Sequence, residues 1–318
     1  MSRRAQSAFA LLALIAACSA PAPMQAKADS GLRLVVLGRA QDGGLPHLGC
    51  ERAECCAAAR RSGRVETPAC LGICGGDGGA LILVEATPAI ETQIAELQRR
   101  TSIEGRGRKP VDAILLTHAH IGHYLGLAQL GREVAATQAM PLFVSQRMAT
   151  FLRDNGPWSQ LVALGQIELR DFAPPSRFRL TQGIDVEAIP VPHRDEFSDT
   201  LAFRIHGPHR TVLFCPDIDA WERNPGLLER LLDGVDVAYL DGTFYDGREL
   251  PERARSEIPH PPMVDTMDRL QAFVKAHPGS VRFIHLNHTN PAWNDDVIAA
   301  SIEARGFRIA QVGESVEL

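Results

Sequence analysis

Three histidines gathered behind one apolar run constrain this chain more than any other feature. The run covers residues 114–116, and the histidines are His118, His120 and His123. Alternate residues of an extended stretch point the same way, so His118 and His120 can bind one ion together, while His123 faces a second position after the chain has turned. Without a metal, the three imidazole rings would repel one another when protonated. The segment therefore predicts a metal centre at the end of a strand.

Three further polar residues, each just after an apolar run, are placed to join this centre: His193, Asp217 and His285. Loops at one edge of a sheet can converge on a single site. Each residue alone has an ordinary explanation, such as a capping aspartate or a solvent-facing histidine. Together with the histidine triplet, they favour a metal site, for which zinc is our first expectation and iron or manganese are alternatives.

The remainder of the chain alternates short β-branched runs with amphipathic stretches. Strands are expected at residues 34–37, 80–85, 113–116, 184–189, 201–205, 211–214, 235–240 and 281–284, and helices at 90–100, 146–155, 227–232, 263–276 and 295–305. The two kinds of element are mixed rather than in strict strand–helix–strand order. This favours sheets packed on each other with helices outside, in one domain over residues 29–318.

The first 28 residues are expected to be a signal peptide. A basic start at Arg3 and Arg4 precedes an apolar run too short to span a bilayer as a mature helix. Two cleavage routes compete: residues 15–18 resemble a bacterial lipobox ending at Cys18, whereas residues 26–28 fit ordinary release. We expect an exported protein, periplasmic or held at the outer membrane by a lipid on Cys18; an uncleaved anchor is the less favoured alternative.

Charge and composition narrow the class of partner. The formal net charge of -5 leaves no basic field to gather phosphate backbones, so nucleic acid is not expected as a partner. We expect a small-molecule substrate, and contact with a membrane only through the N-terminal lipid. The oligomeric state is left open.

The order His-x-His-x-x-His, lone His, Asp and late His resembles the metallo-β-lactamase superfamily. Residues 36–38, 43–46, 241–244 and 284–291 are similar, within it, to the pyrroloquinoline quinone synthesis protein B branch. The resemblance implies an α/β protein of the α+β type, a four-layer αββα sandwich. It also implies two metal positions: one held by His118, His120 and His193, and one by His123 and His285, with Asp217 bridging.

One position departs from the superfamily pattern. The superfamily carries an aspartate, as a ligand of the second metal, directly before the third histidine, and this chain has Gly122 there. The second position then keeps only His123, Asp217 and His285, unless a nearby acid swings in: Asp195, Glu196 or Asp219. We expect one firmly held metal and a weak or absent second one.

The resemblance also indicates a proton donor and a substrate side. In phosphodiesterase relatives, an acidic segment with a downstream histidine acts as general acid, which points to Asp241 and His260. The alternative is that Asp241 ends a strand and His260 sits in a proline-rich loop without catalytic duty. Arg194 either holds an anionic substrate or pairs with a neighbouring acid. Tyr124 either lines the pocket or packs in the core.

Cysteines near the start of the domain suggest a second, structural metal site. In the related branch, cysteines and the histidine three residues after the last catalytic histidine hold a zinc ion, which implies Cys50, Cys55, Cys56 and His288 here. Which of Cys55 and Cys56 binds stays open. Disulfides are the alternative, with Cys70 and Cys74 nearby, because the protein is expected to be exported.

Three functions remain open from the sequence. The leading one is an exported hydrolase in which a metal-activated water attacks an ester, phosphodiester, lactone or amide. The second is an iron-dependent oxidative step in pyrroloquinoline quinone biosynthesis, since iron suits the same ligands. The third is a metal-binding lipoprotein without catalysis.

Overall fold

The computed structural model describes residues 31–76, 79–101, 103, 106–250 and 259–318. The expected signal peptide, with Cys18, lies outside these residues and stays a prediction. No helix within the described ranges is long and apolar enough to cross a membrane.

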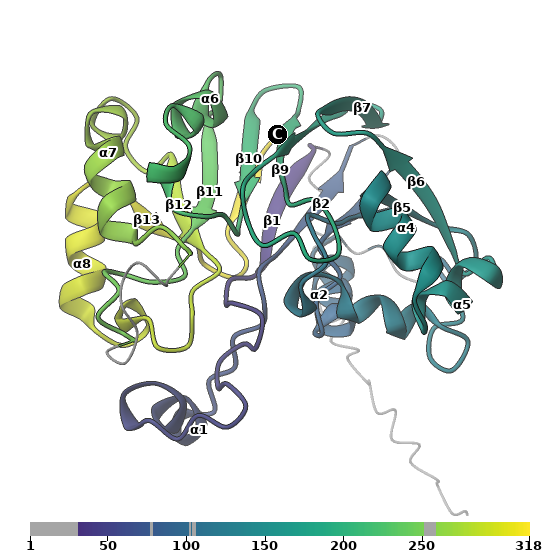
Figure 1. Ribbon diagram of the computed structural model, residues 1–318, viewed down its shortest axis with the longest axis horizontal. Helices are drawn as coiled ribbons and strands as arrows, with labels where there is room; N and C mark the ends of the chain where they lie inside the picture. The colour runs from purple at the N-terminus through teal and green to yellow at the C-terminus, as the bar shows by residue number, and fades with distance from the viewer. Residues whose placement is uncertain (1–30, 77–78, 102, 104–105, 251–258) are drawn as a thin grey trace, which may run out of the picture.

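Two seven-stranded sheets face each other at the centre of the molecule (Figure 1). The first sheet has the order β14 (Ser315–Glu317), β1 (Arg33–Gly38), β2 (Cys70–Gly75), β3 (Ala80–Val84), β4 (Ala113–Leu115), β5 (Met140–Ser145) and β6 (Ile167–Phe172). The second has the order β13 (Arg308–Ile309), β12 (Val281–Ile284), β11 (Val237–Asp241), β10 (Thr211–Cys215), β9 (Leu201–His206), β8 (Ile184–Pro190) and β7 (Ser176–Thr181). Each sheet is mixed, with both antiparallel and parallel pairs.

Helices cover the outer face of each sheet (Figure 1). Beside the first sheet lie α2 (Ile90–Thr101), α4 (Gln146–Asp154) and α5 (Trp158–Ala163), and beside the second lie α6 (Leu227–Leu232), α7 (Met263–Ala276) and α8 (Asp296–Ala304). The short helices α1 (Ala58–Ser62) and α3 (Ile121–Tyr124) belong to connections. The expected four-layer αββα sandwich is thereby confirmed.

The strands supply both inner and outer packing surfaces because successive side chains point to opposite faces. In β1, Leu34 and Val36 join the cluster between the two sheets, where they meet Phe203 and Phe214 of the second sheet. Val35, one step away, joins the separate cluster beneath the helices of the first sheet. The second sheet has its own outer cluster with α6, α7 and α8. Strands buried on both faces explain why their sequences are almost wholly apolar.

All eight predicted strands and all five predicted helices exist, with ends that differ by no more than two residues. The strands β2, β5, β6, β7, β13 and β14 were not expected from the sequence, and the expected helix ranges did not cover α1, α3 or α5.

We predict that Phe203→Ala destabilises the protein by about 3–5 kcal/mol, because it leaves a cavity between the two sheets. Phe203 is fully buried there. Chemical denaturation checks the value, with Val297→Ala as control, since Val297 is 79% exposed and should change stability by less than about 0.5 kcal/mol. A loss for Phe203→Ala as small as that of the control would contradict the packing described.

Candidate metal centre

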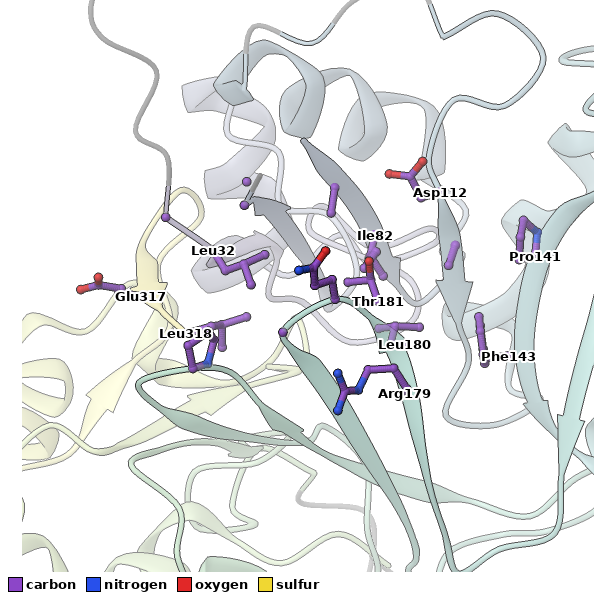
Figure 2. A pocket seen from close by; sticks show the side chains of 18 of the residues that line it. Leu32, Ile82, Asp112, Pro141, Phe143, Arg179, Leu180, Thr181, Glu317 and Leu318 are labelled. Atoms are coloured by element: carbon purple, nitrogen blue, oxygen red, sulfur yellow. The ribbon is translucent and has the colours of Figure 1, made fainter. Parts of the chain in front are cut away.

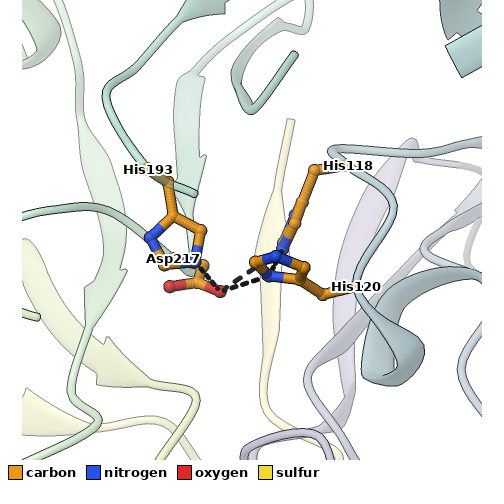
Figure 3. A group of neighbouring side chains, drawn as sticks. All are labelled: His118, His120, His193 and Asp217. Carbon is orange, nitrogen blue, oxygen red and sulfur yellow. Dashed lines mark hydrogen bonds and ion pairs between the residues drawn. The ribbon is translucent and has the colours of Figure 1, made fainter. Parts of the chain in front are cut away.

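Four side chains from three separate loops meet at one edge of the sandwich (Figure 3). His118 and His120 follow β4, His193 follows β8 and Asp217 follows β10. One oxygen of Asp217, Oδ2, lies 3.0 Å from His193 Nε2 and 3.3 Å from His118 Nε2. The Nδ1 atom of His120 lies 2.9 Å from His118 Nε2 and 3.8 Å from Asp217 Oδ2. Strand ends thus bring together residues that are up to 99 positions apart in the sequence.

The spacing of these atoms suits a shared ion. Zinc bonds nitrogen and oxygen at about 2.0–2.2 Å, so tetrahedral ligand atoms lie about 3.4 Å apart. The separations of 2.9, 3.0, 3.3 and 3.8 Å bracket that value. We call these four residues the first cluster. They can close around one small divalent cation.

Neighbouring groups fix the orientation of two of these rings. Thr117 Oγ1 lies 2.9 Å from His118 Nδ1, and Asp219 Oδ1 lies 3.1 Å from His193 Nδ1. With Nδ1 held in this way, Nε2 of each ring points at Asp217. This is the arrangement by which partners outside a metal site orient histidine ligands and raise their basicity.

A second cluster lies beside the first and contains His123 and His285. Their ring centroids are 5.2 Å apart, and His123 Nε2 lies 4.0 Å from Asp217 Oδ2. Glu85 Oε1 contacts His123 Nδ1 at 3.2 Å, and Thr243 Oγ1 contacts His285 Nδ1 at 3.0 Å. In both rings Nε2 is buried without a hydrogen-bond partner.

Two residues of this second cluster have a strained backbone conformation. Glu85 and His285 have φ angles of 84° and 66°, in the left-handed region that residues other than glycine rarely occupy. Strain of this kind persists only where the surroundings over-determine it, and it gathers at functional sites.

None of the three acids expected to swing into the second position does so. Asp219 bonds His193, Glu196 Oε2 lies 3.2 Å from His120 Nε2, and Asp195 pairs with Arg147 at the surface. Instead Asp42, which the sequence analysis missed, places Oδ1 3.3 Å from His123 Nε2 and 3.7 Å from His285 Nε2.

The charge balance at this edge also fits a cation. Burial and the neighbouring His123 lower the pKa of His118 well below its usual value, which leaves a neutral ring with a free lone pair. Burial alone would raise the pKa of Asp217, but the surrounding histidines, His260 first, hold it well below its usual value. Buried carboxylates are stable only when paired or bound to a metal. The neutral imidazole of His118 and the charged carboxylate of Asp217 are both donors that suit a divalent ion.

His260 and Asp241 lie beside both clusters. Asp241 Oδ2 accepts from His260 Nδ1 at 2.8 Å, and Asp217 Oδ1 lies 3.2 Å from the same nitrogen. Burial lowers the pKa of His260, but the two carboxylates outweigh it and raise the pKa well above its usual value. His260 is therefore a protonated group next to the candidate metal centre.

The two residues expected on the substrate side are placed differently. Arg194 is more than half exposed, with one guanidinium nitrogen 3.7 Å from a Glu196 oxygen, so it lies at the rim where either expected role is available to it. Tyr124 is only 6% exposed and packs against Phe151 and Trp158 in the helix-side core. The assignment of Tyr124 to substrate binding is thus corrected to core packing.

A separate hollow does not coincide with the histidines. It measures about 920 Å³ and is lined in part by Leu32, Asp112 and Thr181 (Figure 2). Leu32 and Asp112 directly precede β1 and β4, and Thr181 ends β7 opposite the first residue of β8, whereas the metal-centre loops follow the ends of β4 and β8. The hollow therefore lies at the opposite edge of the sandwich.

The cysteines form a separate cluster with His288. Cys50, Cys56 and His288 offer ligand atoms within 4.8 Å of one another, and Cys55 Sγ lies 3.5 Å from Cys50 Sγ. Burial lowers the pKa of His288 to about 4, so its ring is neutral, and its buried Nδ1 has no partner. All six cysteines of the described residues are free thiols, and the geometry favours Cys56 over Cys55 as the third donor.

Comparisons with known proteins agree with this fold. The family model described as the beta-lactamase superfamily domain matches residues 81–286. Coenzyme PQQ synthesis protein B of Rhizobium meliloti (strain 1021) is 26% identical over 91% of this chain and 99% of its own length. The crystal structure of Zn(2+)-bound PqqB from Methylobacterium extorquens has a TM-score of 0.73 at 22% identity, covering 90% of this chain and 100% of that one. A diphosphatase of the PhnP family has a TM-score of 0.62 at 20% identity, covering 90% and 97%.

We predict that Asp219→Ala weakens metal binding by about 10- to 100-fold, because His193 loses the carboxylate that orients its ring. Titration of metal-depleted protein with zinc measures the change. Asp268→Ala is the control, since Asp268 pairs with Arg305 in an exposed position. Equal affinity in the two variants would contradict an orienting role for Asp219.

We also predict that Cys56→Ser removes one equivalent of tightly bound zinc and lowers the melting temperature, because the thiolate site contributes to folding. Elemental analysis and thermal denaturation check both effects. Cys215→Ala is the control, since Cys215 is buried in β10 away from this cluster. Unchanged zinc in Cys56→Ser, with disulfides found by mass spectrometry, would contradict the structural zinc site.

Proposed function

The chain belongs to the beta-lactamase superfamily, and we propose that it is a metal-dependent hydrolase that acts on a small molecule. The observation that carries the proposal is the first cluster, with His118, His120, His193 and Asp217 around one point. Its substrates would be esters, phosphodiesters, lactones or amides. Zinc is the metal that we propose, in keeping with the zinc-bound PqqB structure.

A divalent ion in this centre would lower the pKa of a bound water and polarise the bond under attack. The protein's own residues supply the rest. Asp241 fixes His260 through Nδ1, which leaves Nε2 to exchange a proton with the leaving atom. Because two carboxylates keep the ring charged, His260 is suited to donate that proton. Arg194 at the rim is available to attract an anionic substrate.

An oxidative role is the second candidate, because the curated relatives that span the whole domain are coenzyme PQQ synthesis proteins. Imidazole and carboxylate donors also suit iron. Metal analysis after air-free purification separates the two: zinc with oxygen-independent turnover supports hydrolysis, and iron with oxygen-dependent turnover supports the oxidative role.

We propose that the protein is exported to the periplasm and that a lipid on Cys18 attaches it to the outer membrane. The support for this is the basic and apolar leader of residues 1–28.

We predict that His118→Ala loses both the first-cluster metal and turnover, because the ion loses one of its four donors. His260→Asn should keep the metal and lose turnover by about 10²- to 10⁴-fold, as expected for a general acid. Metal content and a screen of phosphodiester, lactone and β-lactam substrates measure the two effects. His209→Ala is the control, since His209 is exposed in the turn between β9 and β10. Full turnover in His118→Ala would refute the proposed hydrolysis.

A further inference from the structure

We propose that Asp42 is the carboxylate ligand of a second metal ion, supplied from a different loop to replace the ligand that Gly122 lacks. The proposal rests on the proposed metal-dependent function and deepens it, because it gives the second cluster a full donor set. That set is Asp42, His123 and His285, with Asp217 shared between the two clusters.

The loop that carries Asp42 is held against the loop that carries His285. Ala40 and Leu286 form a β-bridge, and Gln41 N donates to Leu286 O at 2.9 Å. The side chains of Gln41 and Asn287 also bond each other. These bonds fix the backbone next to Asp42 and the backbone next to His285. The approach of Asp42 to His285 is therefore built into the fold.

Gly122 is the second observation, because its missing side chain makes room for Asp42. A Cβ atom at position 122 would lie 2.1 Å from Asp42 Oδ1, 2.5 Å from its Cα and 2.8 Å from its Cβ. Any other residue at 122 would therefore collide with both the side chain and the backbone of Asp42. The space in which the superfamily's aspartate would begin is filled by an aspartate from elsewhere in the chain.

Three buried atoms without hydrogen-bond partners point to a ligand at this place. They are Asp42 Oδ1, His123 Nε2 and His285 Nε2, from three different loops. The Nδ1 atoms of both rings are already engaged, by Glu85 and by Thr243. Buried polar atoms that lack partners require an explanation. One shared cation satisfies all three at once, whereas an ion pair between Asp42 and His123 leaves His285 Nε2 unpaired.

Cobalt titration of metal-depleted protein tests the proposal. Cobalt bound by histidine and carboxylate shows only d–d absorption, while cobalt bound at the cysteine cluster adds thiolate charge-transfer bands, so the sites can be counted separately. In the wild type, two equivalents of cobalt should bind with d–d absorption only, one at each histidine–carboxylate cluster. In Asp42→Ala, the affinity of the weaker of these two sites for cobalt should fall at least tenfold, as it should in His123→Ala. The affinity of the stronger site should not change.

Asp42→Asn repeats the test with the side-chain shape preserved, and it decides the result if Asp42→Ala does not fold. Asp195→Asn is the matched control, because Asp195 is an exposed acid that pairs with Arg147; it should bind like the wild type. The role of Asp42 would be overturned if Asp42→Asn bound two equivalents of cobalt without thiolate bands and with wild-type affinity. It would also be overturned if the wild type bound only one such equivalent of cobalt. Either result would leave the first cluster intact. A wild type that binds none would instead overturn the proposed function.

Discussion

The site depends on one buried carboxylate. Asp217 is 3% exposed, and its Oδ2 atom lies within 4.0 Å of nitrogens from four histidines, while Oδ1 faces His260. A carboxylate taken out of water must be compensated by charge or hydrogen bonds. The histidine loops at this edge are arranged around that requirement, and the two sheets behind them hold the loops in register. Asp217 also links the clusters, since its Oδ2 atom lies near His118 and His193 of the first cluster and near His123 of the second.

Much of the fold was readable from the sequence, because strands buried on both faces are continuous apolar runs. The elements that were missed lack that pattern. The strand β2 contains two glycines and two cysteines, and β5 has Pro141 as its second residue. The strands β6 and β7, each at the edge of a different sheet, are alternating and partly exposed rather than continuously apolar. Their place in the fold is set by the neighbouring strands β5 and β8.

The candidate site was readable for a different reason. Histidines and an aspartate directly after strands follow a local rule, and the structure brings them together. Asp42 follows no such rule: it lies in a glycine-rich loop 81 positions before His123, and only the pairing of that loop with Leu286 brings it near. A sequence signal was nonetheless present, because Gly122 left a donor missing and Asp42 adjoins a segment that resembled the family. Glu85 and Thr243 were equally invisible, since their role is to orient other side chains.

Anomalous diffraction at the absorption edge of the bound metal is the decisive measurement, because it places each ion independently of any activity. We expect one peak within bonding distance of His118, His120, His193 and Asp217, and a second beside Asp42, His123 and His285. Crystals of metal-replete protein with no anomalous peak among these side chains would contradict the account.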